Sequence, residues 1–166
     1  QAMPFFQGEP QQRRFVSTYA LTEGARGYPR ILEFTVVPGD GKRNPPGLRL
    51  IVNEFLYTGP ASAGLTCFGL APDPVTAALV PRFAPIQPRP DSFILADRLL
   101  ASRFRYLQYL PPPDTPRWVD QWIFKELPEA IAVEMAPLPG ENAGVQPMSL
   151  VISLRVDRLP GTRYGD

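Results

Sequence analysis

Proline is the feature that most limits how this sequence can fold, because 22 of its 166 residues are proline. The proline ring fixes φ and leaves the backbone without a hydrogen-bond donor, so it interrupts helices and central strands. We therefore expect short strands joined by rigid loops, and no long helix over most of the chain. Hydrophobic residues at 44% and charged residues at 20% are typical of a globular protein. Together these values predict a single domain over residues 1–166.

The clearest strand pattern lies in the C-terminal half, where apolar side chains recur at every second position. Ile131, Val133 and Met135 alternate with small or charged residues, and Leu150 and Ile152 belong to a second run of this kind. Such alternation, bounded by proline and glycine, is typical of antiparallel strands with one face on a core. Over the whole chain it predicts strands at residues 13–20, 30–37, 48–57, 99–109, 129–136 and 148–157. We expect a first sheet and a variable segment in residues 1–90, and a C-terminal β-meander in residues 91–166.

Residues 58–90 interrupt the strand pattern and are rich in proline, glycine and alanine. One helical signal lies within them, since Asp73 can cap a helix whose first residue is Pro74, before Pro81 ends the run. A loop of this length inside a domain is usually functional or mobile. We expect this segment to be the variable part of the chain, with one or two helical turns.

Charge and residue types exclude several classes of function. Seventeen basic against sixteen acidic side chains leave a net charge of +1, which gives no electrostatic footprint for nucleic acid. The sequence has no histidine, and its one cysteine is Cys67, so no internal disulfide and no Cys/His metal site can form. We expect Cys67 to pack as a small hydrophobic side chain. We therefore expect no cofactor, no metal and no nucleic-acid partner.

Neighbouring carboxylates are the remaining candidates for catalysis. A pair held about 5 to 10 Å apart in a cleft could hydrolyse glycosides, but spacing along the sequence does not establish a cleft. With 16 acidic residues in the chain such neighbours arise by chance, so a solvated surface is the simpler interpretation. The pairs are Asp91 with Asp97, Asp114 with Asp120, and Glu126 with Glu129. Four arginines on predicted strands are interpreted as ordinary exposed positions, with an interface role as the alternative for the second pair: Arg13, Arg14, Arg103 and Arg105.

A series of motifs between residues 93 and 156 resembles a known family. An aromatic strand is followed by a Trp-x-x-x-Trp segment, and then by Leu-Pro-x-Ala-hydrophobic at the start of an alternating strand. In this order and spacing the motifs resemble the C-terminal half of a type II secretion minor pseudopilin of the J type. The residues that carry the resemblance, and that we expect to be structural anchors, are Phe104, Tyr106, Trp118, Trp122, Leu127 and Pro128.

The resemblance implies a fold of the α+β pilin-like family and a non-catalytic structural role. It implies a periplasmic head domain, anchored to the bacterial inner membrane through an N-terminal helix in the full-length protein. Other minor pseudopilins would be its partners, in a hetero-oligomeric complex at the tip of a pseudopilus or type IV pilus-like filament that supports protein secretion. The sequence departs from the family pattern because it contains no long apolar helix. We therefore expect the chain to be a soluble head without that helix.

The main alternative is a soluble β-sandwich that binds carbohydrate, with an exposed aromatic such as Trp118 or Tyr109 stacking on the ligand. An enzyme based on carboxylates is a third interpretation. Burial of both tryptophan rings would favour the pseudopilin head, and an exposed aromatic row beside a groove would favour the binding module. For the pseudopilin head we also expect the apolar face of the C-terminal strands to be covered by the first sheet or to form an elongated docking groove.

Overall fold

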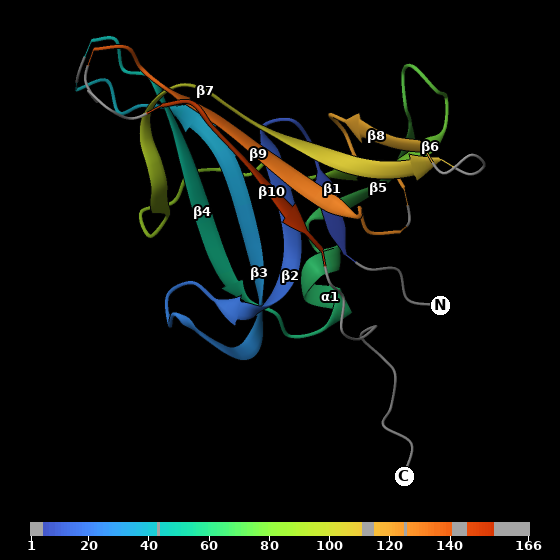
Figure 1. Ribbon diagram of the computed structural model, residues 1–166. Coiled ribbons are helices and arrows are strands. Elements are labelled where there is room, and N and C mark those ends of the chain that lie inside the picture. Colours follow the sequence, from blue (N-terminus) through green and yellow to red (C-terminus); the bar gives the residue numbers. More distant parts are fainter. Residues whose placement is uncertain (1–4, 43, 111–114, 125, 141–145, 155–166) are drawn as a thin grey trace.

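A computed structural model describes residues 5–42, 44–110, 115–124, 126–140 and 146–154 (Figure 1). Within these residues the regular secondary structure consists almost entirely of strands. In chain order the elements are β1 (Phe6–Gly8), β2 (Gln12–Ala20), β3 (Ala25–Pro38), β4 (Leu48–Leu56), α1 (Pro60–Gly64), β5 (Cys67–Pro72), β6 (Leu79–Phe83), β7 (Phe93–Leu110), β8 (Thr115–Val119), β9 (Ala130–Pro137) and β10 (Met148–Ser153). The end of the predicted strand 148–157 lies outside the described residues.

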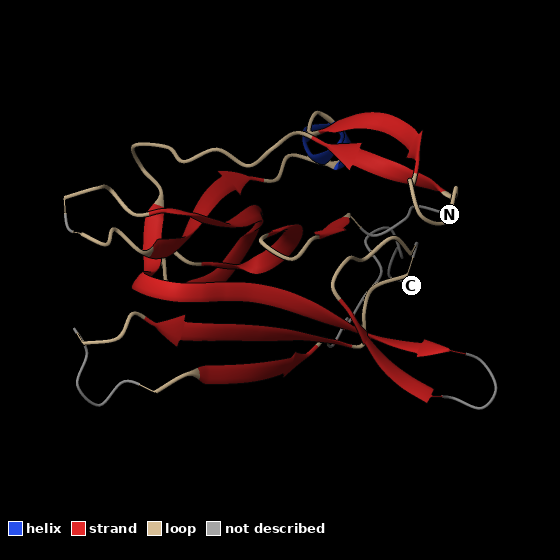
Figure 2. Ribbon diagram, turned by 90° about the horizontal axis from the view of Figure 1, so that it is seen from above, coloured by secondary structure: helices blue, strands red, loops and turns tan. Residues whose placement is uncertain are grey.

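The main sheet is antiparallel and eight-stranded, with the order β1-β2-β3-β4-β7-β9-β10 and with β8 paired to the C-terminal part of β7. β5 and β6 form a separate two-stranded sheet. The main sheet curls into a half-barrel, and β9 and β10 lie on the side opposite the small hairpin and α1 (Figure 2). Because β4 pairs with β7, the two halves of the chain share one sheet.

The α+β pilin-like fold that the resemblance implied is wrong. That fold needs a substantial helix, whereas α1, the one helix in the part of the chain that the structure describes, spans five residues. A helix is not needed to cover the apolar side of the sheet, because the curl brings β3 and β9 together. Leu32 and Phe34 of β3 belong to the same buried cluster as Ile131 and Val133 of β9. The fold is mostly antiparallel β.

The core occupies the concave face of the half-barrel. Alternate side chains of β3, β4, β7 and β9 enter it, as expected for strands with one buried face. The buried members of the cluster are Leu32, Phe34, Leu50, Val52, Leu99, Phe104, Tyr106, Ile131 and Val133. Full burial of an apolar side chain of this size contributes about 1.5 to 3 kcal/mol. This face is therefore the main apolar source of stability in the fold.

The β1–β2 hairpin joins the edge of the half-barrel to β7 and to the segment after β8. The N–H of Phe104 donates to the carbonyl of Pro10 at 2.8 Å, and the N–H of Trp122 donates to the carbonyl of Gly8 at 2.8 Å. Gly8 and Trp122 form an antiparallel bridge. These bonds give β1 a neighbour on its outer edge, although the strand has only three residues.

Residues 58–90 hold more regular structure than their sequence indicated. α1 begins at Pro60, a residue type favoured in the first turn of a helix, and β5 and β6 form a hairpin. The helical turn expected at Asp73 is instead the turn of this hairpin. The Asp73 carboxylate accepts hydrogen bonds from the N–H groups of Val75 and Thr76, at 3.0 and 2.8 Å. An aspartate that bonds the backbone two residues on stabilises a turn as well as it caps a helix.

Candidate interaction surface

The inner side of β10 carries exposed apolar side chains at the border of the core. Met148, Leu150 and Ile152 are 48%, 49% and 39% exposed. Leu150 pairs in register with Val133, and Ile152 pairs with Ile131. Directly paired residues of an antiparallel sheet point to the same face. These three exposed side chains therefore extend the apolar core face beyond its covered part, and we call them the open margin.

We expected the apolar face of the C-terminal strands either to be covered by the first sheet or to form an open groove. In the structure the two strands differ. Ile131 and Val133 of β9 are buried in the core cluster, together with residues of β3 and β4. The open margin belongs to β10, which is the last strand of the sheet and, among the described residues, has a paired neighbour on one side only. The apolar face is thus covered on β9 and open on β10.

Arg13 places a positive charge within the concave face. Its guanidinium carbon lies 4.2 Å from the ring centroid of Phe34 and 4.8 Å from that of Phe104. Aromatic ring faces attract a cation, yet the buried Nε of Arg13 has no hydrogen-bond partner among the described residues. Burial lowers the pKa of Arg13 to about 10, so the side chain remains charged at neutral pH. The interpretation of Arg13 as an ordinary exposed position is wrong, because its side chain enters the core face of β2.

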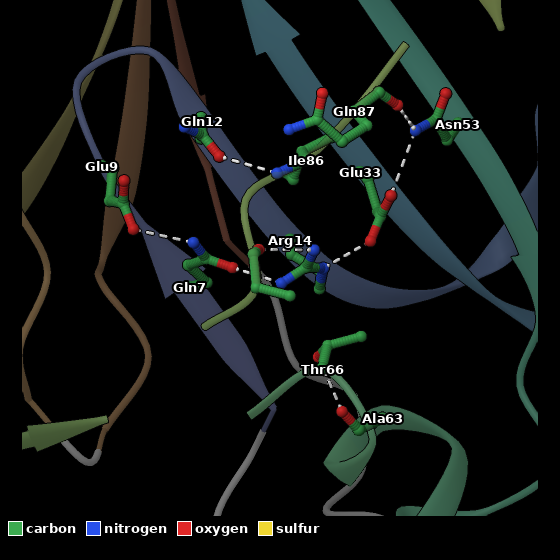
Figure 3. Close-up of polar contacts among 11 residues, drawn as sticks. Gln7, Glu9, Gln12, Arg14, Glu33, Asn53, Ala63, Thr66, Ile86 and Gln87 are labelled. Carbon is green, nitrogen blue, oxygen red and sulfur yellow. Dashed lines mark hydrogen bonds and ion pairs between the residues drawn. The ribbon is translucent and has the colours of Figure 1, made fainter. Parts of the chain in front are cut away.

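A buried polar network lies on the opposite face of β2, β3 and β4 (Figure 3). Arg14 donates from Nε to Glu33 Oε1 at 2.6 Å and from Nη1 to Gln7 Oε1 at 2.7 Å. Asn53 Nδ2 donates to the second carboxylate oxygen of Glu33 at 3.1 Å. All four side chains belong to buried residues. Arg14 is therefore buried as well, against the expectation from its strand position.

Segment 84–92 crosses this network and is held mainly through its backbone (Figure 3). The N–H of Ile86 donates to Gln12 Oε1 at 3.1 Å, and Asn53 Nδ2 donates to the carbonyl of Gln87 at 3.0 Å. The side chain of Ile86 is buried beneath the segment. The polar groups of the network are thus used to fix a long connection across the sheet. In the sequence the signal is one polar side chain on each of three successive predicted strands, Arg14, Glu33 and Asn53, and of these only Arg14 was expected at an exposed position.

The expected structural anchors divide into a buried group and a half-buried group. Phe104, Tyr106 and Pro128 are buried, and Trp118, Trp122 and Leu127 are half-buried. The ring of Trp122 lies 6.5 Å from that of Tyr106 and 4.9 Å from that of Phe124, measured between centroids. Its Nε1 donates to the carbonyl of Glu126 at 2.7 Å. The structure therefore brings Trp122 to the edge of the core.

Trp118 lies apart from Trp122, on the arm formed by β7 and β8. It pairs in register with Leu107, while Tyr109 pairs with Pro116. Because positions two apart on a strand and directly paired positions share a face, Trp118 and Tyr109 lie on the same face of this arm. Tyr109 is exposed and Trp118 is half-buried. The arm therefore presents two aromatic side chains on one surface.

Among the described residues, the neighbouring carboxylates Asp91 and Asp97 pair with different arginines. Asp97 accepts a hydrogen bond from Nε of Arg49 at 2.8 Å, and this bond is the main reason why the pKa of Asp97 is lowered. Asp91 pairs instead with Arg89, at 3.0 Å. Asp120, Glu126 and Glu129 are exposed, and Asp114 lies outside the described residues. The side chains of Arg49 and Asp97 help to line a polar hollow of about 220 Å³, in which Asp40 also pairs with Arg49.

The remaining candidate residues are Cys67, Arg103 and Arg105. Cys67 is half-buried at the start of β5. Arg103 and Arg105 both pair with Glu134 on the outer face of β7 and β9. Among the residues that the structure describes, no group of three or more potential metal ligands occurs. Within the same ranges, no helix is long and apolar enough to cross a membrane.

No protein-family model matches this chain, and no curated protein matches it. The functional interpretation therefore depends on the residue pattern and on the geometry of the open margin and of the β7–β8 arm.

Proposed function

We propose that this chain is a non-catalytic structural subunit that packs against other protein subunits through the open margin. The observation that carries the proposal is the exposure of Met148, Leu150 and Ile152 beside a buried apolar face. Apolar side chains gathered on one surface next to a core are typical of protein interaction sites. Burying them against a partner removes apolar area from water, which is the main driving force of protein association.

The assembly that we propose is the tip of a pseudopilus or of a type IV pilus-like filament that supports protein secretion. The order of motifs from Phe104 to Ile131 supports this choice, because it resembles the J-type minor pseudopilins. Its partners would be other minor pseudopilins, in a periplasmic complex at the bacterial inner membrane. The proposal rests on this residue pattern and on the open margin, and it does not use a pilin-like fold.

The proposal is tested by mixing the purified chain with purified heads of the minor pseudopilins from the same bacterium. We expect a hetero-complex in sedimentation velocity, and we expect Leu150→Glu to weaken it by about tenfold or more, since a buried charge in an apolar contact is costly. Leu70→Glu is the matched control, because Leu70 is also an exposed leucine but lies on β5. Absence of any complex, or equal effects of the two substitutions, would refute assembly through the open margin.

Carbohydrate binding is the second candidate, and the shared face of Trp118 and Tyr109 on the β7–β8 arm favours it. Two aromatic rings on one surface can stack on the apolar faces of sugar rings. Calorimetric titration with a panel of oligosaccharides tests this function. Binding that is lost in Trp118→Ala and kept in Leu150→Glu would place carbohydrate binding ahead of subunit assembly.

A further inference from the structure

β10 lacks the features that usually protect the edge of a sheet. Natural edge strands are kept from pairing with other chains by charged side chains, proline, bulges or very short length. β10 has six residues, none of them charged and none of them proline, and its pairing with β9 runs without a register shift. All six residues are exposed. The opposite edge differs, because β1 has only three residues and is bridged at Gly8 by Trp122.

The hydrogen-bonding direction of β10 follows from one contact just after it. The N–H of Leu154 donates to the carbonyl of Glu129 at 2.9 Å, so the backbone groups of Leu154 point toward the β9 side. In an antiparallel ladder the backbone groups of successive residues point alternately to the two sides. The N–H and C=O groups of Ser149, Val151 and Ser153 therefore point away from β9, to the free edge.

The side chains of β10 form a nearly palindromic series around Val151. The order is Ser149, Leu150, Val151, Ile152, Ser153. If two such strands pair antiparallel about a two-fold axis at Val151, each serine faces a serine, each Leu150 faces an Ile152, and Val151 faces itself. This register makes about six backbone hydrogen bonds between the free-edge groups, and it places no charges opposite one another.

We propose that β10 pairs with β10 of a second copy of this chain, in an antiparallel register centred on Val151. The proposal deepens the proposed function, since it names one partner of the same apolar surface. An axis perpendicular to the sheet keeps the two open margins on the same side, so the Leu150 and Ile152 side chains of the two copies cover one another. A two-fold contact of this kind uses the same patch on both copies and closes at the dimer.

The contact is small, so the dimer forms in a concentration-dependent way. Two edge strands bury less area than the roughly 1,200 to 2,000 Å² of a standard interface. In sedimentation equilibrium we expect the average mass to rise from the 18.5 kDa of one chain toward twice that value as the concentration increases. Val151→Lys places two like charges opposite each other at the axis, so we expect dimerisation to weaken by about tenfold or more. Leu70→Lys, at an exposed position of β5, should leave it unchanged.

The register is tested by cross-linking in a Cys67→Ser background, which removes the one natural thiol. Cα atoms of a hydrogen-bonded antiparallel pair lie about 5.5 Å apart, within the range that a disulfide spans. Val151→Cys should therefore give a covalent dimer under mild oxidation. Ser149→Cys is the control on the same strand and face. In the proposed register Ser149 faces Ser153 of the second copy. The two introduced cysteines would therefore lie four positions apart, about 13 Å at the rise of a strand, and should not cross-link.

The outcomes separate this inference from the proposed function. A chain that stays monomeric at every concentration, a dimer that survives Val151→Lys, or equal cross-linking of the two cysteine variants overturns β10 pairing. A hetero-complex with minor pseudopilin heads that forms from such a monomer leaves the proposed function standing. Conversely, a Val151-centred dimer in the absence of any hetero-complex supports self-pairing and refutes assembly with those partners.

Discussion

Arg14 and Glu33 form an ion pair on adjacent strands, with Nε and Oε1 2.6 Å apart and with side chains that are 2% and 8% exposed. The two residues are direct partners in the register of β2 and β3. Arg14 also donates from Nη2 to the carbonyl of Ala84 at 3.2 Å, so the pair is covered by the segment that it holds. The stability that this ion pair contributes therefore depends on segment 84–92 as well as on the sheet.

Arg14→Ala should destabilise the fold by about 3 to 5 kcal/mol, because it leaves the Glu33 carboxylate buried without its charged partner. Urea denaturation measures the loss. Arg89→Ala is the control, since the ion pair of Arg89 with Asp91 is largely exposed and such pairs contribute about 0 to 1 kcal/mol. Similar losses in the two variants would contradict the buried role of Arg14.

Arg13→Met should stabilise the fold, in contrast to Arg14→Ala. Burial lowers the pKa of Arg13 to about 10, well below its ordinary value, which corresponds to a cost of about 3 kcal/mol for keeping the charged form buried. Contacts with aromatic rings recover about 2 kcal/mol of this cost. Replacement by an apolar side chain of similar length should therefore raise the free energy of unfolding by about 1 kcal/mol at pH 7. Arg14→Met, the same substitution one residue later, should lower it, and a loss of stability in both variants would argue against an uncompensated charge at Arg13.

The strands that form the core could be predicted from the sequence because their alternation is local. Leu32 and Phe34, like Ile131 and Val133, show which face of each strand is buried without knowledge of any other segment. The pilin-like fold could not be judged in the same way. The order of strand motifs does not show what covers the apolar face, which could be a helix or another part of the sheet. Here the curl of the sheet covers it. The alternation therefore predicted these strands correctly, whereas the architecture implied by the family resemblance was wrong.

The polar network could not be predicted because its burial depends on contacts between distant residues. Arg14 and Glu33 occupy alternate polar positions, which in isolation are typical of a solvent-facing side. They are buried because segment 84–92 crosses them: Arg14 donates to the carbonyl of Ala84, 70 residues away in sequence, and Asn53, which donates to Glu33, also donates to the carbonyl of Gln87. The open margin was easier to find, since Leu150 and Ile152 belong to a regular alternating strand. Only the position of β10 at the sheet edge shows that they remain exposed.

Tyr106 should make stability fall in alkaline solution. Burial raises the pKa of Tyr106 well above its ordinary 10.0, and its hydroxyl donates to the carbonyl of Glu9 at 2.9 Å. When the folded pKa exceeds the unfolded one, the contribution is complete below the unfolded pKa and is lost as pH rises toward the folded pKa. The loss should therefore begin near pH 10. Tyr106→Phe should cost about 1 kcal/mol at pH 7 through the missing hydrogen bond, and should lose less stability than the parent above pH 10.

The comparison of variant with parent is essential for this measurement, because Arg13 acts in the opposite direction over the same pH range. Its folded pKa of about 10 lies below its ordinary value, so its effect is a gain of stability as pH rises above about 10. Tyr109→Phe, at an exposed position, should follow the parent from pH 7 to pH 12. If the curves of Tyr106→Phe and the parent stay parallel above pH 10, ionisation of Tyr106 is not coupled to unfolding.

Gly8 should tolerate no side chain, because it lies where the β1–β2 hairpin meets the core. A Cβ atom at Gly8 would lie 2.8 Å from Cζ of Tyr106 and 2.9 Å from both Cε1 of Phe6 and Cβ of Trp122. The Tyr106 and Trp122 sides of this space are fixed, since the Tyr106 hydroxyl donates to the carbonyl of Glu9 and the Trp122 N–H donates to the carbonyl of Gly8. Gly8→Ala should therefore destabilise the fold by about 1 to 3 kcal/mol through overpacking.

Gly64→Ala is the matched control for Gly8→Ala, because a Cβ atom at Gly64 would meet no atom within 4 Å. At an unstrained position the same substitution stabilises by about 0.4 to 1 kcal/mol, through reduced entropy of the unfolded chain. Urea denaturation followed by tryptophan fluorescence gives both values, and one of the two tryptophans, Trp122, lies at the hairpin contact. Because the clash opens the Gly8–Trp122 bridge, Gly8→Ala should also shift the native emission toward that of an exposed tryptophan, whereas Gly64→Ala should not. Equal stabilities and unchanged spectra in the two variants would show that the hairpin is not packed against Tyr106 and Trp122 as tightly as these distances require.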